Sequence, residues 1–112
     1  MPTIKEFVLW ECLHSEKLVV ADANVFALPN IATYPTALLA QIQVQAGNLR
    51  VREDGTAVTT TVGALVTCTD ATNPPMIDLN SKVTTGDPLA NVSLVSPAGG
   101  CTLWISYYGK VV

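Results

Sequence analysis

Residues 49–63 read LRVREDGTAVTTTVG and join a short alternating strand to a Thr-rich segment through an acidic turn. Asp54-Gly55 is a strong short-range turn signal, because glycine tolerates the positive φ of tight hairpins and aspartate tolerates left-handed conformations. Gly63 interrupts the β-branched run that follows and predicts a bulge or a sharp bend. We therefore expect Asp54, Gly55 and Gly63 to determine the fold locally, by fixing the register of a hairpin.

The segment just before this turn contains the clearest strand pattern of the chain. Residues 37–46 alternate strictly, which predicts a strand with one buried and one polar face. Gly47-Asn48 is expected to form the next turn, after which Leu49 and Val51 continue the apolar face. The apolar face consists of Leu38, Ala40, Ile42, Val44 and Ala46, and the polar side chains are Gln41, Gln43, Gln45, Arg50 and Arg52.

The remaining sequence predicts further short strands and no helix. Residues 14–16 are interpreted as a turn and residues 96–100 as a hairpin loop. Strands are expected at residues 4–13, 18–20, 25–28, 59–62, 65–68, 76–79, 91–95 and 102–108. This spacing is typical of an all-β fold, either a single small antiparallel β-sandwich or a jelly-roll-like barrel. Residues 1–112 are expected to form one domain, with residues 1–36 either inside it or forming an N-terminal arm that pairs with a neighbour.

Charged residues make up only 13% of the chain, whereas 49% of it is hydrophobic. Soluble domains typically contain ~25% charged residues, so uncharged polar side chains must cover much of this surface. A neutral Thr-rich β surface and a surface reserved for burial in an assembly both explain the shortage. The net charge of -3 and six scattered basic residues argue against nucleic acid as a partner. No apolar run has the length of a membrane span, so no membrane partner and synthesis in the cytosol are expected.

The three cysteines, Cys12, Cys68 and Cys101, are far apart and form no CxxC pair. They are expected to be free thiols in a reducing compartment, each buried as a small hydrophobic side chain. A zinc site would need further ligands, and His14 is the only histidine. Three aspartates in or near expected loops lack the DxDxDG spacing of a calcium loop: Asp70, Asp78 and Asp87. The sequence therefore predicts no metal and no cofactor.

Catalytic residues are almost missing from the sequence. A Ser-His-Asp or Cys-His arrangement would have to use His14, which lies beside Glu16 and Lys17 and is interpreted as a solvated turn residue. Glu53 and Asp54 are adjacent carboxylates, and adjacent side chains usually diverge, whereas an acid/base pair must converge on one bond. We therefore do not expect an enzyme.

Four aromatic residues suggest a host-glycan binding module as an alternative of another class: Trp10, Trp104, Tyr107 and Tyr108. Tyr107 and Tyr108 are neighbours in a strand and point to opposite faces, so at most one of them belongs to any given surface. Tryptophan is also a common core or interface anchor. Exposure of Trp10 or Trp104 would favour the glycan alternative.

The order of an alternating strand, RVREDGTAVTTTVG, loops and a final strand LWISYY resembles small virion proteins of tailed bacteriophages. In that family an alternating strand leads into Arg, an acidic-Gly turn and a Thr segment closed by Gly, and the last strand ends in paired Tyr. The resemblance covers about residues 37–108. The matching positions are Arg50 or Arg52, Asp54, Gly55, Thr56, Thr59, Thr61, Gly63, Tyr107 and Tyr108.

The resemblance implies a non-enzymatic structural protein that is made in the host cytoplasm and located in the virion. The leading expectation is a capsid decoration or cement protein, forming a homo-oligomer that binds and stabilises the lattice of the major capsid protein. A tail, fibre-base or head-tail accessory protein, contacting other virion proteins, is the alternative within the particle. The side chains expected to make contact, or else to form ordinary solvated sheet, are Gln41, Gln43, Gln45, Arg50, Arg52, Trp104 and Tyr108.

Overall fold

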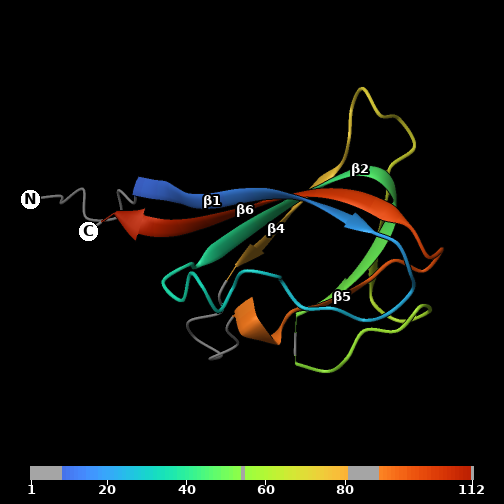
Figure 1. The fold of residues 1–112 in the computed structure, drawn as a ribbon, viewed down its shortest axis with the longest axis horizontal. Helices are drawn as coiled ribbons and strands as arrows, with labels where there is room; N and C mark the ends of the chain where they lie inside the picture. The colour runs from blue at the N-terminus through green and yellow to red at the C-terminus, as the bar shows by residue number, and fades with distance from the viewer. Residues whose placement is uncertain (1–8, 54, 81–88, 112) are drawn as a thin grey trace, which may run out of the picture.

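The computed structural model describes residues 9–53, 55–80 and 89–111. Within this part of the chain every paired strand is antiparallel and no α-helix is present, so the all-β prediction is confirmed (Figure 1). The elements are β1 (Leu9–Val20), β2 (Leu39–Arg52), β3 (Ala64–Thr67), β4 (Met76–Asn80), the 3-10 helix η1 (Leu89–Asn91), β5 (Ser93–Val95) and β6 (Cys101–Val111).

The long strand β2 is the centre of the sheet. Its first half lies between β6 and β4, and its second half lies between β5 and β3. β5 and β6 therefore follow one another along one edge of β2, while β3 and β4 follow one another along the other edge. Residues 96–100 connect two segments on the same edge, so the prediction of a hairpin there was wrong. β1 completes the order by pairing with β6.

β2 bends in the middle without ending. The pairing of β2 with β6 slips between Val44 and Ala46, which leaves Gln45 as an extra residue, and Gly47 follows with a φ of 79°. The extra residue shifts the alternation by one position, so Val44 and Leu49 both point into the core although they are five residues apart. The Gly47-Asn48 turn predicted from the sequence is thus a bend within one continuous strand.

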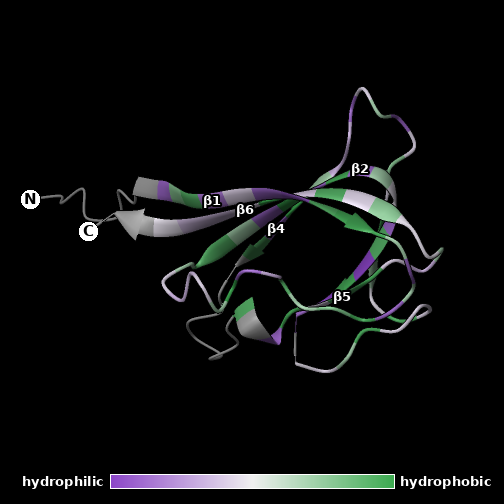
Figure 2. Cartoon of the chain, viewed as in Figure 1, coloured by the Kyte–Doolittle hydropathy of each residue, from purple (hydrophilic) through white to green (hydrophobic). Residues whose placement is uncertain are grey.

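The core lies on the concave side of the bent six-stranded sheet. Hydrophobic residues alternate with hydrophilic ones along β2 and with residues of near-neutral hydropathy along the first part of β6, as a strand with one buried face requires (Figure 2). The fully enclosed side chains include Ala40, Ile42, Val44, Leu49, Leu94, Leu103, Ile105 and Tyr107, each 0% exposed.

β1 differs from its prediction because it runs unbroken through residues 14–16, where a turn was expected. A register shift between Cys12 and His14 marks a bulge, and the pairing with β6 continues on both sides of it. β1 and β6 form a ribbon whose outer end carries the start of β1 and the end of β6 (Figure 1). Residues 9–20 thus pair with β6 of their own chain, and residues 1–8 lie outside the described residues.

The connection between β2 and β3 also differs from its prediction. The two strands do pair as an antiparallel hairpin, but the link spans residues 53–63, and residues 59–62 form a turn in place of the expected strand. Val58 is 1% exposed, and its backbone N–H donates to the hydroxyl of Ser93. Burial of the Val58 side chain stabilises the wide conformation of the loop between β2 and β3. Gly63, with a φ of 134°, lies at the predicted bend before β3, and Asp54 lies outside the described residues.

Candidate interaction surface

The convex side of the sheet formed by β1, β6, the first half of β2 and β4 carries a surface that we call the outer face. Its members alternate with the buried residues of the same strands, and cross-strand pairing aligns them in rows. The outer face consists of Cys12, Ser15, Lys17 and Val19 of β1, Thr102, Trp104, Ser106 and Tyr108 of β6, Leu39, Gln41 and Gln43 of β2, and Met76 and Asp78 of β4.

Three large apolar side chains of the outer face are exposed. Val19 is 66% exposed, Met76 is 54% exposed and Trp104 is 41% exposed. Trp104 lies in one row with Lys17 and Gln43, and Met76 is the neighbour of Gln43 on its far side. Tryptophan is a typical anchor of protein interfaces, because its large ring buries apolar area with little loss of side-chain entropy.

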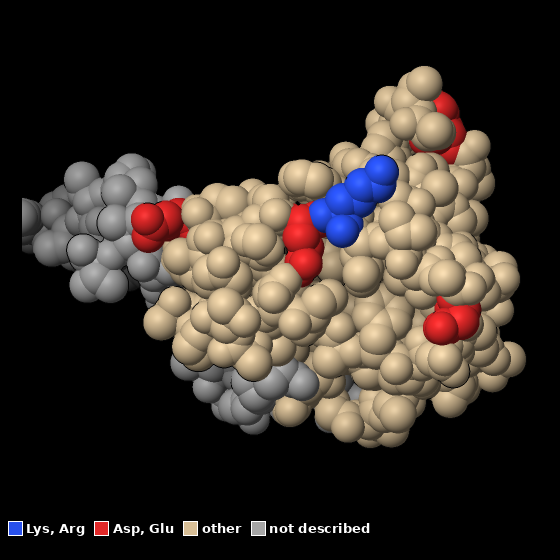
Figure 3. Space-filling view, in the orientation of Figure 1, with Lys and Arg blue, Asp and Glu red and all other residues tan. Residues whose placement is uncertain are grey.

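Uncharged polar groups fill most of the remaining outer face. The Ser15 and Ser106 hydroxyls lie 2.9 Å apart across the β1–β6 pair, and the Gln45 amide donates to the Gln43 carbonyl oxygen at 3.0 Å. The wider surface is also poor in charge, since blue and red side chains are few and scattered on the side drawn in Figure 3. Removal of such groups from water costs far less than removal of charges, so this face is suited to burial against a partner.

The structure brings together five of the seven side chains that the sequence singled out for contact. Gln41, Gln43, Trp104 and Tyr108 lie on the outer face, and the side chain of Gln45, the bulged residue, joins them through Gln43. The two arginines lie elsewhere, in the second half of β2.

Arg50 serves the fold of its own chain. Its guanidinium donates from Nε to the carbonyl oxygen of Thr60 at 3.1 Å and from an Nη to that of Gly63 at 2.7 Å. These bonds hold the loop between β2 and β3 against the sheet. Arg52 also has an interaction within the chain. Neither arginine adds a free cation to the outer face.

Sequence reasoning missed the contributions of β1 and β4 to the outer face. Lys17 and Val19 belong to a stretch that was interpreted as partly turn, and Met76 and Asp78 belong to a short strand with no assigned partner. The signal that could have found them is the alternation of Lys17 and Val19 with Leu18 and Val20, which marks one continuous strand.

A polar cluster holds residues 28–37 against the inner side of β1 and β6. The His14 ring stacks on Tyr34 with centroids 5.0 Å apart and on Tyr107 at 6.1 Å. The Tyr107 hydroxyl donates to Oε2 of Glu16 at 3.0 Å and accepts from the backbone N–H of Asn30 at 3.2 Å. Burial raises the pKa of Tyr107, the Asn30 N–H opposes the shift, and Glu16 adds to it. His14 is therefore a half-buried strand residue, and its interpretation as a solvated turn residue was wrong.

The hydrogen bonds of Glu16 link β1 to the segment of residues 28–37 and to β6. The Asn30 side-chain amide donates to Oε1 of Glu16 at 2.7 Å, so both carboxylate oxygens accept from groups of the same chain. Tyr107 is 0% exposed, which keeps its hydroxyl away from any external reactant. The bonds tie residues 28–37 to the strands.

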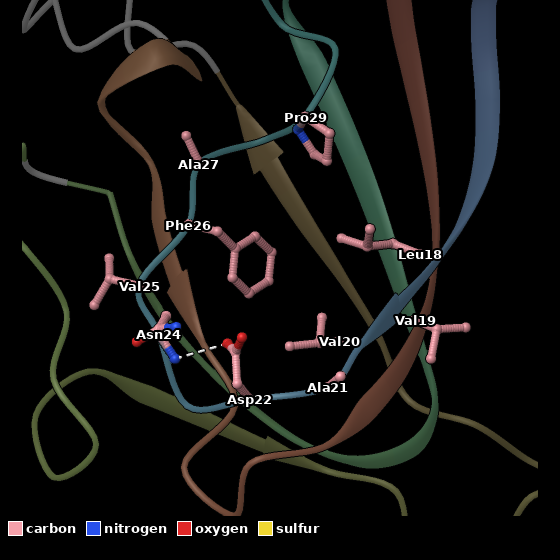
Figure 4. A pocket seen from close by; sticks show the side chains of 10 residues that line it. All are labelled: Leu18, Val19, Val20, Ala21, Asp22, Asn24, Val25, Phe26, Ala27 and Pro29. Atoms are coloured by element: carbon pink, nitrogen blue, oxygen red, sulfur yellow. Dashed lines mark hydrogen bonds between the residues drawn. The ribbon is translucent and has the colours of Figure 1, made fainter.

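An open apolar pocket of about 490 Å3 lies where β1 ends and the chain turns back. Leu18 and Val20 point toward the ring of Phe26, whereas Val19 points to the opposite side of β1 (Figure 4). The carboxylate of Asp22 accepts from the backbone N–H of Asn24, which shapes the turn at the rim. The pocket is continuous with the core, because Leu18, Val20 and Phe26 also pack against it.

The three cysteines are free, but they are not all buried as predicted. Cys101 is buried, Cys68 is half-buried and Cys12 is exposed on the ribbon of β1 and β6. Burial raises the pKa of the Cys101 thiol, and a hydrogen bond with Ser96 opposes that shift. Cys12 is exposed because it lies on the outer face, where no described residue covers it.

Among the described residues no group of three or more His, Cys, Asp or Glu side chains could hold a metal ion. Asp78 lies on the outer face and Asp70 on the loop before β4, while Asp87 is outside residues 9–53, 55–80 and 89–111. Hydrogen bonds from Thr72 lower the pKa of Asp70. No helix in the described part of the chain is long and apolar enough to cross a membrane. Comparisons with known protein families, with curated proteins and with solved structures found no match to this chain.

Proposed function

We propose that this chain is a non-enzymatic structural protein of a tailed-bacteriophage virion, in the first place a capsid decoration or cement protein. In this role it is made in the host cytoplasm, associates with further copies of itself and contacts the major capsid protein. The residues of the loop between β2 and β3 and the paired Tyr107 and Tyr108 carry the resemblance to such proteins. Tail, fibre-base or head-tail accessory proteins are the alternative within the virion.

The observation that best supports this proposal is the outer face. It is a broad strand surface with a single cation, Lys17, and a single anion, Asp78, among its members, and with Trp104, Met76 and Val19 exposed between neutral polar groups. Burial of such a surface in an assembly would remove its apolar area from water without desolvating many charges. Contacts of modest strength suffice when they are repeated around a shell.

Purified virions test the proposal. A quantified gel should show hundreds of copies per particle for a decoration protein, and at most a few dozen for a tail protein. Heads that lack the protein should lose resistance to heat and to osmotic shock. Absence of the chain from purified particles would refute a virion role, and equal stability of complete and depleted heads would refute the cement role.

The exposed Trp104 also favours one function of another class, the binding of a host glycan. Tryptophan rings stack on sugar faces, and the amide of Gln43 beside Trp104 could bond sugar hydroxyls. Tyr107 cannot take part because it is fully buried on the other side of β6. A glycan array with the wild-type chain and Trp104→Ala tests this function: binding that depends on Trp104 supports it, and an array without hits removes it.

A further inference from the structure

The two charges of the outer face lie on its opposite borders. Lys17 is in β1 and Asp78 is in β4, and the strand order between them is β6 and then β2. Both side chains are exposed, and neither makes an ion pair within the described residues. A face with a cation on one border and an anion on the other is complementary to a copy of itself turned by half a rotation.

We propose that the partner of the outer face is a second copy of this chain, related by a two-fold axis parallel to the strands. This inference deepens the proposed function, since it rests on the outer face being an assembly surface and names what covers it. An axis in this direction places β1 of each copy over β4 of the other. An axis in the plane of the sheet and perpendicular to the strands would place β1 over β1 and β4 over β4, which would keep Lys17 of each copy away from Asp78 of the other.

Cross-strand register predicts the contacts of this dimer. Lys17, Trp104, Gln43 and Met76 form one row across the four strands, and the two-fold axis reverses the order of that row in the partner copy. Trp104 then faces Gln43 of the other copy, and the aliphatic stem of Lys17 faces Met76. Asp78 is two residues from Met76 along β4, about 7 Å, which the flexible lysine side chain can span to reach it.

The size of the face predicts a weak dimer. The strand segments that form it, residues 12–19, 102–108, 39–43 and 76–78, cover about 400 Å2 per copy at the usual spacings of strands and residues, or about 800 Å2 for the pair. That area is smaller than a standard specific interface of about 1,200–2,000 Å2. We therefore expect a reversible dimer with a dissociation constant of roughly a hundred micromolar, not an obligate one.

Charge-reversal variants of the purified full chain test the pairing by sedimentation equilibrium over a wide concentration range. Lys17→Glu and Asp78→Lys should each weaken dimerisation about tenfold, because each places two like-charged pairs in the symmetric interface. The exchanged variant, Lys17→Glu with Asp78→Lys, restores opposite charges and should return to within about threefold of the wild type. Asp22→Lys, a charge reversal in the loop after β1, should leave the affinity unchanged and serves as the control.

Two further variants test whether dimerisation depends on the Trp104 side chain itself or on exposed apolar area in general. Trp104→Ala should weaken the dimer at least about tenfold. Leu65→Ser is matched for exposure, at 50% against 41%, and lies on β3 outside the outer face, so it should have no effect. Circular dichroism of each variant shows whether it is folded.

Three results would overturn the inference: a wild-type chain that is monomeric at millimolar concentration, an exchanged variant no tighter than the single reversals, or a dimer indifferent to Trp104→Ala. In the first case, crosslinking of the outer face to another virion protein would identify that protein as the partner. Because this assay uses the isolated chain, its failure leaves the copy number in virions unaffected. Absence from virions, in turn, would refute the proposed function and leave a measured dimer standing.

Discussion

Replacement of Gly47 by alanine tests whether the bend of β2 depends on close contact with β6. Gly47 has a φ of 79°, a left-handed conformation that alanine adopts only with strain. A Cβ at this position would overlap the carbonyl oxygen of Gly100 and lie 3.0 Å from Cα of Cys101. Both obstacles are backbone atoms of the segment that leads into β6, so no side-chain rotation can relieve the overlap.

Gly99 provides a matched control for the loss of unfolding free energy caused by replacement of glycine with alanine. Its φ is also 79°, but a Cβ there would meet nothing within 4 Å. Gly99→Ala should therefore show the conformational cost alone, about 1 kcal/mol. Gly47→Ala adds the displacement of a packed backbone, typically about 1–3 kcal/mol for overpacking, so we expect a total loss of about 3 kcal/mol.

Equilibrium unfolding in urea, followed by tryptophan fluorescence, measures both losses. Domains of this size have a total stability of about 5–15 kcal/mol, so a difference of about 2 kcal/mol between the two variants is well resolved. The slope of the unfolding transition should stay constant, which shows that the difference lies in the folded state. Equal losses for the two variants would refute the reasoning, because β6 would then yield to the added methyl group without cost.

Three other predictions concern the hydroxyl groups of Ser96 and Tyr107 and the thiols of Cys12 and Cys101. Ser96→Ala removes a buried hydroxyl that donates to the Asn48 carbonyl and accepts from a backbone N–H, so the free energy of unfolding should fall by about 1–3 kcal/mol in the urea assay. Since the pKa of Tyr107 is raised in the folded state, stability should be complete below the usual tyrosine pKa of about 10 and fall as the pH rises above it; Tyr107→Phe should weaken this alkaline dependence in thermal melts. Exposed Cys12 should react with a thiol reagent in the native protein, whereas buried Cys101, whose pKa is raised by burial, should react only after unfolding.

Each of these predictions has an outcome that contradicts it. A Ser96→Ala variant as stable as the wild type would mean that water replaces both hydrogen bonds. An alkaline loss of stability that persists unchanged in Tyr107→Phe would assign it to other groups. Reaction of Cys101 at the rate of Cys12 would mean that the β6 end of the sheet opens readily.

The local sequence pattern was sufficient to predict those strands that have one fully buried face. The alternating apolar residues of 37–44 and 102–108 lie on the core side as predicted, whereas Ala46, predicted on the same apolar face, is exposed because the bulge at Gln45 shifts the alternation. A slip of one residue would move every apolar side chain into water, so the register of such strands is strongly determined by sequence. The outer-face residues Gln41, Gln43, Trp104 and Tyr108 were singled out from the sequence for the same reason.

The local sequence pattern predicted the wrong conformation where contacts with residues distant along the chain determine the structure. His14 and Glu16 have the composition of a turn, but stacking on Tyr34 and Tyr107 and a hydrogen bond from Tyr107 keep them in β1. Val58 follows a strong turn signal, but its burial requires a wide loop in place of a tight hairpin. These partners are up to 93 residues away along the chain, and no local propensity reports them.

The charges on the borders of the outer face have a second physical role, which the exchanged variant separates from recognition. β1 and β4 form the two edges of this part of the sheet, and a charged side chain on an edge strand discourages uncontrolled pairing with other chains. Lys17→Glu and Asp78→Lys each keep a charge on the edge, so protection of the edge is unchanged in both. Each single variant only changes the charges at positions 17 and 78 from opposite signs to the same sign. Loss of the dimer in the single variants and its recovery in the exchanged variant would therefore report pairing between copies, because a merely protective charge works with either sign.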